Sequence, residues 1–387
     1  MNSTTNALPV NFETFGEARR AGFMRAKAIK DAGGRIAGTF CTYTPNEIFD
    51  AAGIYTVSLC GTSDETIPDA ERDLPKNLCP LIKSSYGFAV SDKCPYTYFS
   101  DIIIGETTCD GKKKMYEMLG ELKDVFILQL PQRQDLPGML DMWTAELHRL
   151  IETLEQKFDI TITDEALREA VRKRNQLRRA TGDLLSLGAL TPPAAYMKDL
   201  FQVTNSTGFS FVLGGNTDVL EEATSRIRAA YEAGSRPVPA ASKRILVTGC
   251  PIGGVLDKTI GTIERNGGVV VCLENCNGTK QAENLIDEEA DDIVRAIARR
   301  YLDIGCAVMS PNPHRIEEIR ALSKEYQIDG IVDIVLAFCQ PYGIETRQIG
   351  KAARELGLPY IAIETDYSGT DRGQLETRLA AFLEMME

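Results

Sequence analysis

The stretch SDIIIGETTCDGKKKMYE, residues 100–117, joins a short apolar run to a segment of helical pattern through Cys109. The run predicts a buried β-strand, and the residues from Asp110 onward predict the helix that follows it. Further strands of this kind are predicted on either side, at RIAGTFC (35–41), IYTVSLC (54–60) and VFILQL (125–130). Strands that alternate with helices at this spacing indicate a parallel, doubly wound sheet.

The same alternation returns in the last third of the chain. Strands are predicted at RILVTG (244–249), GGVVVCLENC (267–276), IDGIVDIVLAFC (328–339) and PYIAIETD (359–366), and a long helix at AENLIDEEADDIVRAIARRYLDIG (282–305). Between the two regions lie long helical patterns that Pro192 and Pro193 interrupt. The sequence therefore predicts an α/β protein with two doubly wound parallel-sheet domains, residues 1–138 and 243–387, and a helical segment, residues 139–235, between them.

Composition excludes several classes of protein. The 387 residues are 43% hydrophobic and 25% charged, which is typical of a globular chain and excludes a disordered or fibrous one. The net charge of −12 argues against nucleic-acid binding through bulk charge. The N-terminal residues lack the basic and apolar regions of a secretory signal, and no apolar run approaches the roughly 18 residues of a membrane span. We expect a soluble, cytoplasmic protein that binds neither nucleic acid nor membrane.

Ten cysteines stand out in such a chain, because disulfides are rare in cytosolic proteins. Ligands of open α/β sheets gather at the carboxyl ends of the strands, where helix N-termini also lie. Cys79 opens a predicted helix on that edge, and six other cysteines lie at or just past predicted strand ends: Cys41, Cys60, Cys109, Cys250, Cys276 and Cys339. This placement favours a thiolate-ligated metal or cluster site.

The remaining three cysteines are better explained as buried apolar residues. Cys94 falls between a helix end and a strand start, Cys272 lies inside an apolar strand, and Cys306 follows a helix. No Cys-x-x-Cys pair occurs, which weakens a zinc ribbon or a ferredoxin-type cluster. Scattered single cysteines suit an iron–sulfur cluster held in a cleft between two domains, but ten inert, buried thiols remain the alternative.

Two further motifs bear on function. The turn from Gly249 to Gly254 lacks the Lys-Ser/Thr pair of a phosphate loop, so any ATP is expected to be bound by another protein. The lysines Lys112, Lys113 and Lys114 follow Cys109 in the first turn of a helix, where cations oppose the macrodipole. They could offset the charge of an anionic cluster, dock an acidic partner, or form a solvated face.

Four segments resemble the family of 2-hydroxyacyl-CoA dehydratases and benzoyl-CoA reductases. They are CTYTPNEIFDAAG (41–53), NLCPLIKSSYGF (77–88), the opening stretch 100–117, and AIETDYSGTDRGQLETRLAAF (362–382). The surplus of cysteines looks closest to the double-cubane cluster protein of that family. The resemblance implies two [4Fe–4S] cubanes joined by a sulfide, electrons delivered by a separate ATP-hydrolysing protein with its own [4Fe–4S] cluster, and a homodimer.

The resemblance also implies ligands. Cys79, Cys109 and Cys339 match the three cysteines that hold one cubane in the ordinary dehydratases. Cys41, Cys60 and Cys250 are the choice for a second cubane because they share the predicted sheet edge, with Cys276 in reserve. Glu274 and Glu364 lie at predicted strand ends and could relay protons to a substrate. A structural carboxylate, paired with Arg378 or a lysine, is the alternative for these two glutamates.

The leading hypothesis is thus an oxygen-sensitive iron–sulfur reductase, [8Fe–9S], that reduces a small molecule which no residue pattern names. The runner-up is a 2-hydroxyacyl-CoA dehydratase subunit, a lyase with a single [4Fe–4S] cluster. Two further hypotheses are a cluster-carrying electron-transfer protein and a metal-free binding protein.

Overall fold

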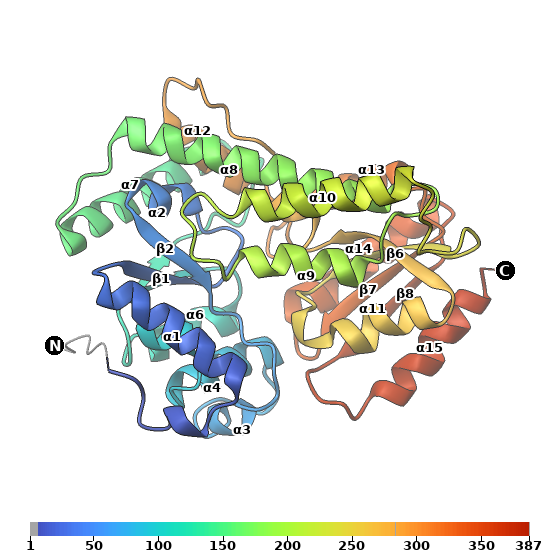
Figure 1. The fold of residues 1–387 in the computed structure, drawn as a ribbon, viewed down its shortest axis with the longest axis horizontal. Helices are drawn as coiled ribbons and strands as arrows, with labels where there is room; N and C mark the ends of the chain where they lie inside the picture. Colours follow the sequence, from blue (N-terminus) through green and yellow to red (C-terminus); the bar gives the residue numbers. More distant parts are fainter. Residues whose placement is uncertain (1–6, 283, 387) are drawn as a thin grey trace. The chain divides into compact units, whose positions relative to one another are not determined.

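The computed structural model describes residues 7–282 and 284–386. By their internal contacts they divide into two units. The first comprises residues up to Arg174 together with Gly208–Gly215 and Ile286–Leu302. The second comprises Asn175–Thr207, Asn216–Leu285 and the chain from Asp303 onward. The helix α8, Asp164–Leu185, begins in the first unit and ends in the second (Figure 1).

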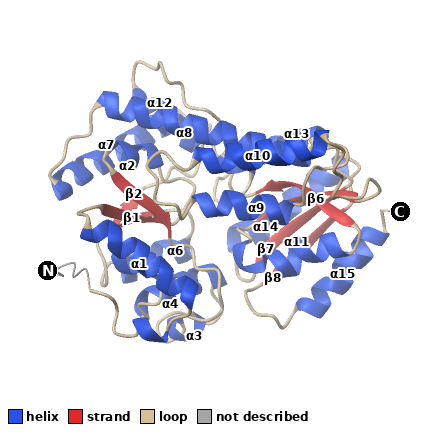
Figure 2. Cartoon of the chain, in the orientation of Figure 1, coloured by secondary structure: helices blue, strands red, loops and turns tan. Residues whose placement is uncertain are grey.

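The first unit is a four-stranded parallel sheet with the strand order β2-β1-β3-β4, drawn in red among its helices in Figure 2. Its elements are α1 (Glu17–Asp31), β1 (Arg35–Thr39), α2 (Asn46–Ala51), β2 (Ile54–Ser58), α3 (Ile67–Ala70), α4 (Pro80–Val90), α5 (Pro95–Phe99), β3 (Ile102–Glu106), α6 (Asp110–Leu119), β4 (Val125–Leu128), α7 (Met139–Phe158) and α12 (Ile293–Leu302). The strand β3 is buried at every position, as a central strand with helices on both faces must be.

The second unit repeats this topology in the order β6-β5-β7-β8. Its elements are α9 (Met197–Thr207), α10 (Thr217–Glu232), β5 (Lys243–Gly249), α11 (Leu256–Arg265), β6 (Gly268–Glu274), α13 (Pro313–Glu325), β7 (Gly330–Leu336), α14 (Gln340–Glu355), β8 (Tyr360–Thr365) and α15 (Arg372–Glu384). Its core joins Leu246, Val269, Ile331 and Ile349 from three strands and α14. The predicted α/β class with two parallel sheets is confirmed.

Strand order decides where each unit can bind a ligand. In each sheet, the strand that comes second in the sequence lies on one side of the first strand, and the third strand lies on its other side. The connections that leave the first and third strands therefore run in opposite directions, between β1 and β3 in the first unit and between β5 and β7 in the second. Open parallel sheets bind ligands at the carboxyl ends of the strands at such a switch point. Each unit therefore has one edge position favoured by its topology.

Several predicted boundaries are wrong. The strands β3 and β7 end at Glu106 and Leu336, three residues before the predicted ends at Cys109 and Cys339, because these two cysteines become helix N-caps. The predicted helix 282–305 shrinks to α12, since the carboxylate of Asp292 accepts a hydrogen bond from the Arg295 N–H at 2.9 Å and caps the helix there. Residue 283 of that prediction lies outside the described residues. The helix α13 was not predicted.

The unit boundaries also differ from the three predicted segments. The helices α7 to α10 do fill the segment predicted to be helical, yet the division into units falls inside α8. The helix α12, more than 100 residues further on, packs against α7 in the first unit. An ion pair of 2.5 Å between Arg295 and Asp141 joins these two helices.

Candidate functional site

Thiols collect at the carboxyl ends of the strands in the first unit. Cys41 lies two residues past β1, Cys60 lies two residues past β2, and Cys109, the N-cap of α6, lies three residues past β3. Cys79 is the N-cap of α4. In the described residues, the sulfur of Cys79 and the sulfur of Cys109 form no hydrogen bond that caps the helix. The partial positive charge of a helix N-terminus favours anionic groups such as thiolates at these positions.

The half-buried Lys112 and the buried Glu106 lie near the Cys60 thiol. The Cys60 thiol donates to the Phe40 carbonyl at 3.1 Å, and the Lys112 ammonium donates to the same oxygen at 3.2 Å. Burial raises the pKa of the Cys60 thiol, and Lys112 acts in the opposite direction. Glu106, at the end of β3, is fully buried. Burial raises the pKa of Glu106 to about 7, although Lys112 and a hydrogen bond from the Thr44 hydroxyl oppose the shift.

The second unit places thiols at equivalent points of its sheet. Cys250 directly follows β5, Cys276 lies two residues past β6, and Cys339 is the N-cap of α14 after β7. Gly249 has a φ of +111°, and a Cβ there would lie 2.1 Å from the Ile334 carbonyl oxygen. This glycine therefore permits the turn in which the backbone N–H of Cys250 reaches the Ile334 carbonyl at 2.8 Å.

Cys306 belongs to the same region. Its sulfur lies 3.6 Å from the hydroxyl of Tyr342, a residue in the first turn of α14. Cys276 and Cys306 both act electrostatically on Tyr342 and on Lys280. Cys306 is buried, as predicted, but it also lies beside this edge, because the chain after α12 returns to the start of α14. Whether Cys306 binds metal stays untested.

A repeat in the order of the cysteines could have revealed this. Each unit has one thiol after its first strand, one after its second and one N-cap after its third. Between the second and third strands the first unit has Cys79 and Cys94, and the second unit has Cys306. The series is Cys41, Cys60, Cys79 and Cys109 in the first unit, with Cys94 in addition, and Cys250, Cys276, Cys306 and Cys339 in the second. The repeat shows in topology alone, which is why sequence periodicity missed it.

The two remaining cysteines have other surroundings. Cys94 caps the five-residue helix α5, and its sulfur accepts a hydrogen bond from the Thr97 N–H at 3.4 Å. Cys272 is buried in the core of the second unit, within β6, as predicted for an apolar residue. Among the described residues, no three cysteine, histidine, aspartate or glutamate side chains lie together as a preformed metal cage.

The two predicted proton-relay residues have opposite environments. Glu274 ends β6 fully buried, with its carboxylate 2.6 Å from the Lys280 ammonium and 3.2 Å from the Arg315 guanidinium. Burial alone would raise the pKa of Glu274, but the two cations outweigh it and hold that pKa below its ordinary value. This geometry favours the predicted alternative of a structural carboxylate paired with a lysine. Arg378 instead donates to the Ala362 carbonyl at 2.8 Å.

Glu364, by contrast, is exposed on the edge strand β8, next to Val335 of β7 in register. A carboxylate in this position can exchange protons with water. It therefore remains a candidate for proton transfer, whereas Glu274 is held as an anion by its partners.

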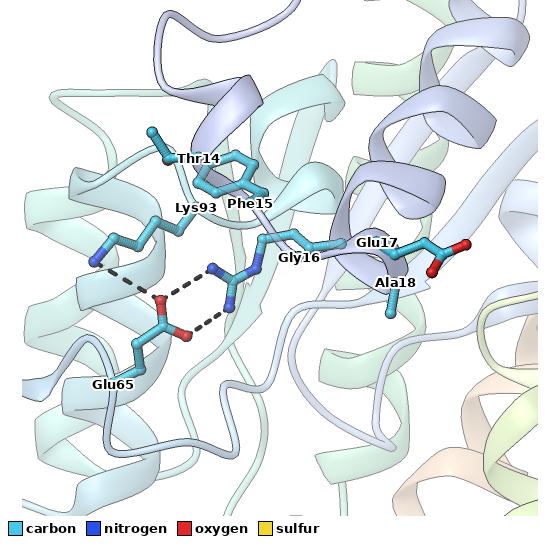
Figure 3. A pocket seen from close by; sticks show the side chains of 8 residues that line it. Thr14, Phe15, Gly16, Glu17, Ala18, Glu65 and Lys93 are labelled. Carbon is cyan, nitrogen blue, oxygen red and sulfur yellow. Dashed lines mark hydrogen bonds and ion pairs between the residues drawn. The ribbon is translucent and has the colours of Figure 1, made fainter.

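A surface cavity of about 540 Å³ lies elsewhere in the first unit. The Glu65 carboxylate lies 2.6 Å from the Arg19 guanidinium and 3.9 Å from the Lys93 ammonium. Figure 3 shows dashed lines from Glu65 to Lys93 and to a guanidinium group. The residues that line it are Thr14, Phe15, Gly16, Glu17, Ala18, Arg19, Glu65 and Lys93. None of these eight is a cysteine, and their main charges neutralise one another, so the thiol groups mark the better candidate site.

Comparison with known proteins identifies the family. The family model described as 2-hydroxyglutaryl-CoA dehydratase, D-component, matches residues 41–386. The chain belongs to this family. The range matched by the dehydratase family model begins at Cys41 and includes all ten cysteines. None of the helices in the described residues is long and apolar enough to span a bilayer.

Three curated relatives illustrate the spread of this dehydratase family. The chain is 48% identical over 385 residues to the "Putative dehydratase subunit YjiM" of Escherichia coli K12, covering 99% of this chain and all of the relative. It is 24% identical to the (R)-phenyllactyl-CoA dehydratase beta subunit of Clostridium sporogenes, over 93% and 94% of the two chains. It is 22% identical to a benzoyl-CoA reductase subunit of Thauera aromatica, over 88% and 89%. The family thus contains both dehydratase and reductase subunits.

Proposed function

We propose that this protein is an iron–sulfur reductase that carries a double-cubane [8Fe–9S] cluster. It would accept low-potential electrons from an ATP-hydrolysing [4Fe–4S] partner and reduce a small molecule. The observation that carries the proposal is the repeated set of four thiols at the carboxyl edge of each sheet. By the resemblance, three cysteines hold the one cubane of an ordinary dehydratase, which is half of the six ligands proposed here. A bound iron–sulfur cluster would supply one-electron chemistry at low potential.

The donor chemistry of the site fits such a cluster, since thiolates are the preferred protein ligands of iron–sulfur centres. The proposed ligands are Cys41, Cys60, Cys79, Cys109, Cys250 and Cys339, with Cys276 in reserve. The chain's own part is to orient these sulfurs at strand ends and helix N-termini. Lys112 adds a positive charge beside them, and Glu364 is the proposed residue for proton exchange. We further propose that the chain acts as a homodimer in the cytoplasm.

The second candidate is a 2-hydroxyacyl-CoA dehydratase subunit with a single [4Fe–4S] cluster. The names of the relatives favour it, because several are dehydratase beta subunits. Such an enzyme would need a different partner subunit and an acyl-CoA substrate. A chain that forms a stable homodimer and has no affinity for acyl-CoA would contradict this candidate.

Metal content separates the two candidates. Protein purified without oxygen is expected to hold about eight iron atoms and about nine sulfides per chain if the double-cubane proposal holds, with a brown visible spectrum. About four iron atoms per chain would favour the dehydratase. A colourless preparation without iron, obtained under reducing, iron-replete expression, would contradict both.

Individual ligands can be tested with a matched pair of helix N-caps. Cys109→Ser is expected to lose about half the iron or more, because serine is a poor ligand for iron–sulfur clusters. Cys94→Ser, at the N-cap of α5, is expected to keep all of it and change stability only modestly. Iron content is measured for both variants and for Cys250→Ser and Cys306→Ser, which shows for each thiol whether its removal costs iron. Iron loss in Cys306→Ser with full retention in Cys250→Ser would replace Cys250 by Cys306 in the proposed set.

A further inference from the structure

The three consecutive lysines after Cys109 have different surroundings. Lys113 forms an ion pair of 2.7 Å with Asp110, and Lys114 forms one of 2.9 Å with Glu117, both near solvent. Lys112 is half-buried and points the other way, toward the Phe40 carbonyl. Among the ion pairs of the described residues none involves Lys112. Only this lysine is therefore turned toward the thiol group rather than toward solvent or a carboxylate.

The groups that face Lys112 supply little negative charge when the thiols are protonated. They are Cys41 and Cys60 from the loops after β1 and β2, Glu106 from β3, and Tyr116 from its own helix. Burial raises the pKa of the Tyr116 phenol well above its ordinary value, so it is neutral. The raised pKa of Glu106, about 7, leaves that carboxyl largely protonated in mildly acidic solution. The sources of negative charge beside Lys112 are therefore the thiolates and, from neutral pH upward, the ionised fraction of Glu106.

The position of Lys112 adds to this imbalance. It lies in the first turn of α6, where the helix macrodipole already contributes positive charge. A partly buried cation in such a place is unfavourable unless an anion lies nearby. In the second unit, Lys280 lies in a comparable setting beside Cys276 and Cys306, but there Glu274 neutralises it at 2.6 Å. The first unit has no such ion pair at Lys112 among its described residues.

We propose that Lys112 is a positioning cation for the thiolates of Cys41 and Cys60, and that its fixed charge stabilises the reduced, more negative state of a cluster bound there. The inference rests on the proposed iron–sulfur function. By this inference, the charge of Lys112 raises the reduction potential of the cluster enough for its electron donor to reduce it. Lys112 acts through the thiolates and takes no part in the chemistry itself.

The test compares Lys112→Met with Lys112→Arg and with the neighbouring control Lys113→Met, all in the full-length protein purified without oxygen. Removing the charge is expected to lower the equilibrium constant for one-electron reduction about tenfold, a shift of the midpoint potential by about 59 mV to more negative values. Lys112→Arg, which keeps the charge, is expected to stay near the wild type, and so is Lys113→Met. If Lys112→Met no longer retains iron while the other two do, the proposal is also supported.

A second readout needs no cluster. In the iron-free chain at about pH 5, where Glu106 is largely protonated, Lys112→Met is expected to raise the thermal unfolding midpoint, because a half-buried cation with little counter-charge is replaced by an apolar side chain of similar length. A lysine with a merely structural role would give the opposite sign. An unchanged midpoint potential in iron-loaded Lys112→Met, or a lowered unfolding midpoint in its iron-free form, overturns the proposal. A wild-type chain that binds no iron at all would instead refute the proposed function.

Discussion

Glu274→Ala is expected to destabilise the second unit more than any other single change considered for this protein. The substitution leaves two cations, Lys280 and Arg315, at 0% and 1% exposure without the carboxylate that both contact. Removing one partner of a buried ion pair costs about 3–5 kcal/mol. Here a single removal takes the carboxylate away from two buried cations at once, although Arg315 keeps its ion pair with Glu345. Because a domain is stable by only about 5–15 kcal/mol, this loss is a large fraction of the total, and the unfolding midpoint of the second unit should fall strongly.

Calorimetry and circular dichroism of Glu274→Ala and of Glu364→Gln would check this prediction. Glu364 is the matched control, an exposed glutamate in the same sheet, and its replacement should change the unfolding midpoint very little. The double variant Glu274→Ala/Lys280→Met also removes one of the two buried cations that contact Glu274 and should recover part of the loss. A Glu274→Ala protein that keeps its stability but loses turnover would show that Glu274 acts in proton transfer after all.

Glu106→Gln is expected to flatten the dependence of stability on pH in the iron-free protein. In the folded chain the pKa of Glu106 rises to about 7, whereas in the unfolded chain it has its ordinary value near 4.5. The folded state therefore binds the extra proton between these values, and the free energy of unfolding falls as pH rises through this window. A shift of this size corresponds to about 3 kcal/mol, present below the unfolded pKa and lost above pH 7.

Thermal unfolding of wild type and Glu106→Gln at about pH 5 and pH 8 measures the effect. The change in stability between the two pH values is determined for each protein, and the two changes are then compared. Glu117→Gln on α6, an exposed residue paired with Lys114, is the control and should follow the wild type. The amide can keep the hydrogen bond from Thr44, so the comparison isolates the lost titration. Equal pH dependence in Glu106→Gln and wild type would mean that Glu106 is ionised throughout. It would then be the counter-charge of Lys112, and the inference about Lys112 would fall with it.

The sequence predicted the class of fold well because strands such as β3 and β7 are continuous apolar runs between turn residues. It failed at their ends, since Cys109 and Cys339 are compatible both with a strand and with the extended N-cap of a helix. It also overextended α12, because the acidic residues before Asp292 carry no signal that distinguishes a first helical turn from a loop.

The part of the candidate site that follows directly from the order of strands and helices was predicted from the sequence. Strand ends point to a shared edge, so Cys41, Cys60 and Cys109 could be placed from sequence. Cys306 could not, because its neighbour Tyr342 is distant in sequence and depends on how α13 and α14 return to the sheet. The ion pairs of Glu274 with Lys280 and Arg315 were missed in detail for the same reason. Charge compensation in the interior is a property of tertiary contacts.

The packing of α12 against α7 has a consequence for how the chain is made. Tyr301 of α12 donates to the carboxylate of Glu47 at 2.8 Å and accepts from the Asn46 backbone N–H at 3.2 Å, at the start of α2. Arg168 of α8 in turn donates to the Glu288 and Ala290 carbonyls just before α12. A growing polypeptide that has produced the first sheet must therefore wait for more than 100 further residues to leave the ribosome before that unit is complete. Synthesis and folding therefore cannot proceed here as two successive modules. A truncation between α7 and α12 would leave the face of α7 that packs against α12 uncovered for cellular quality control to recognise.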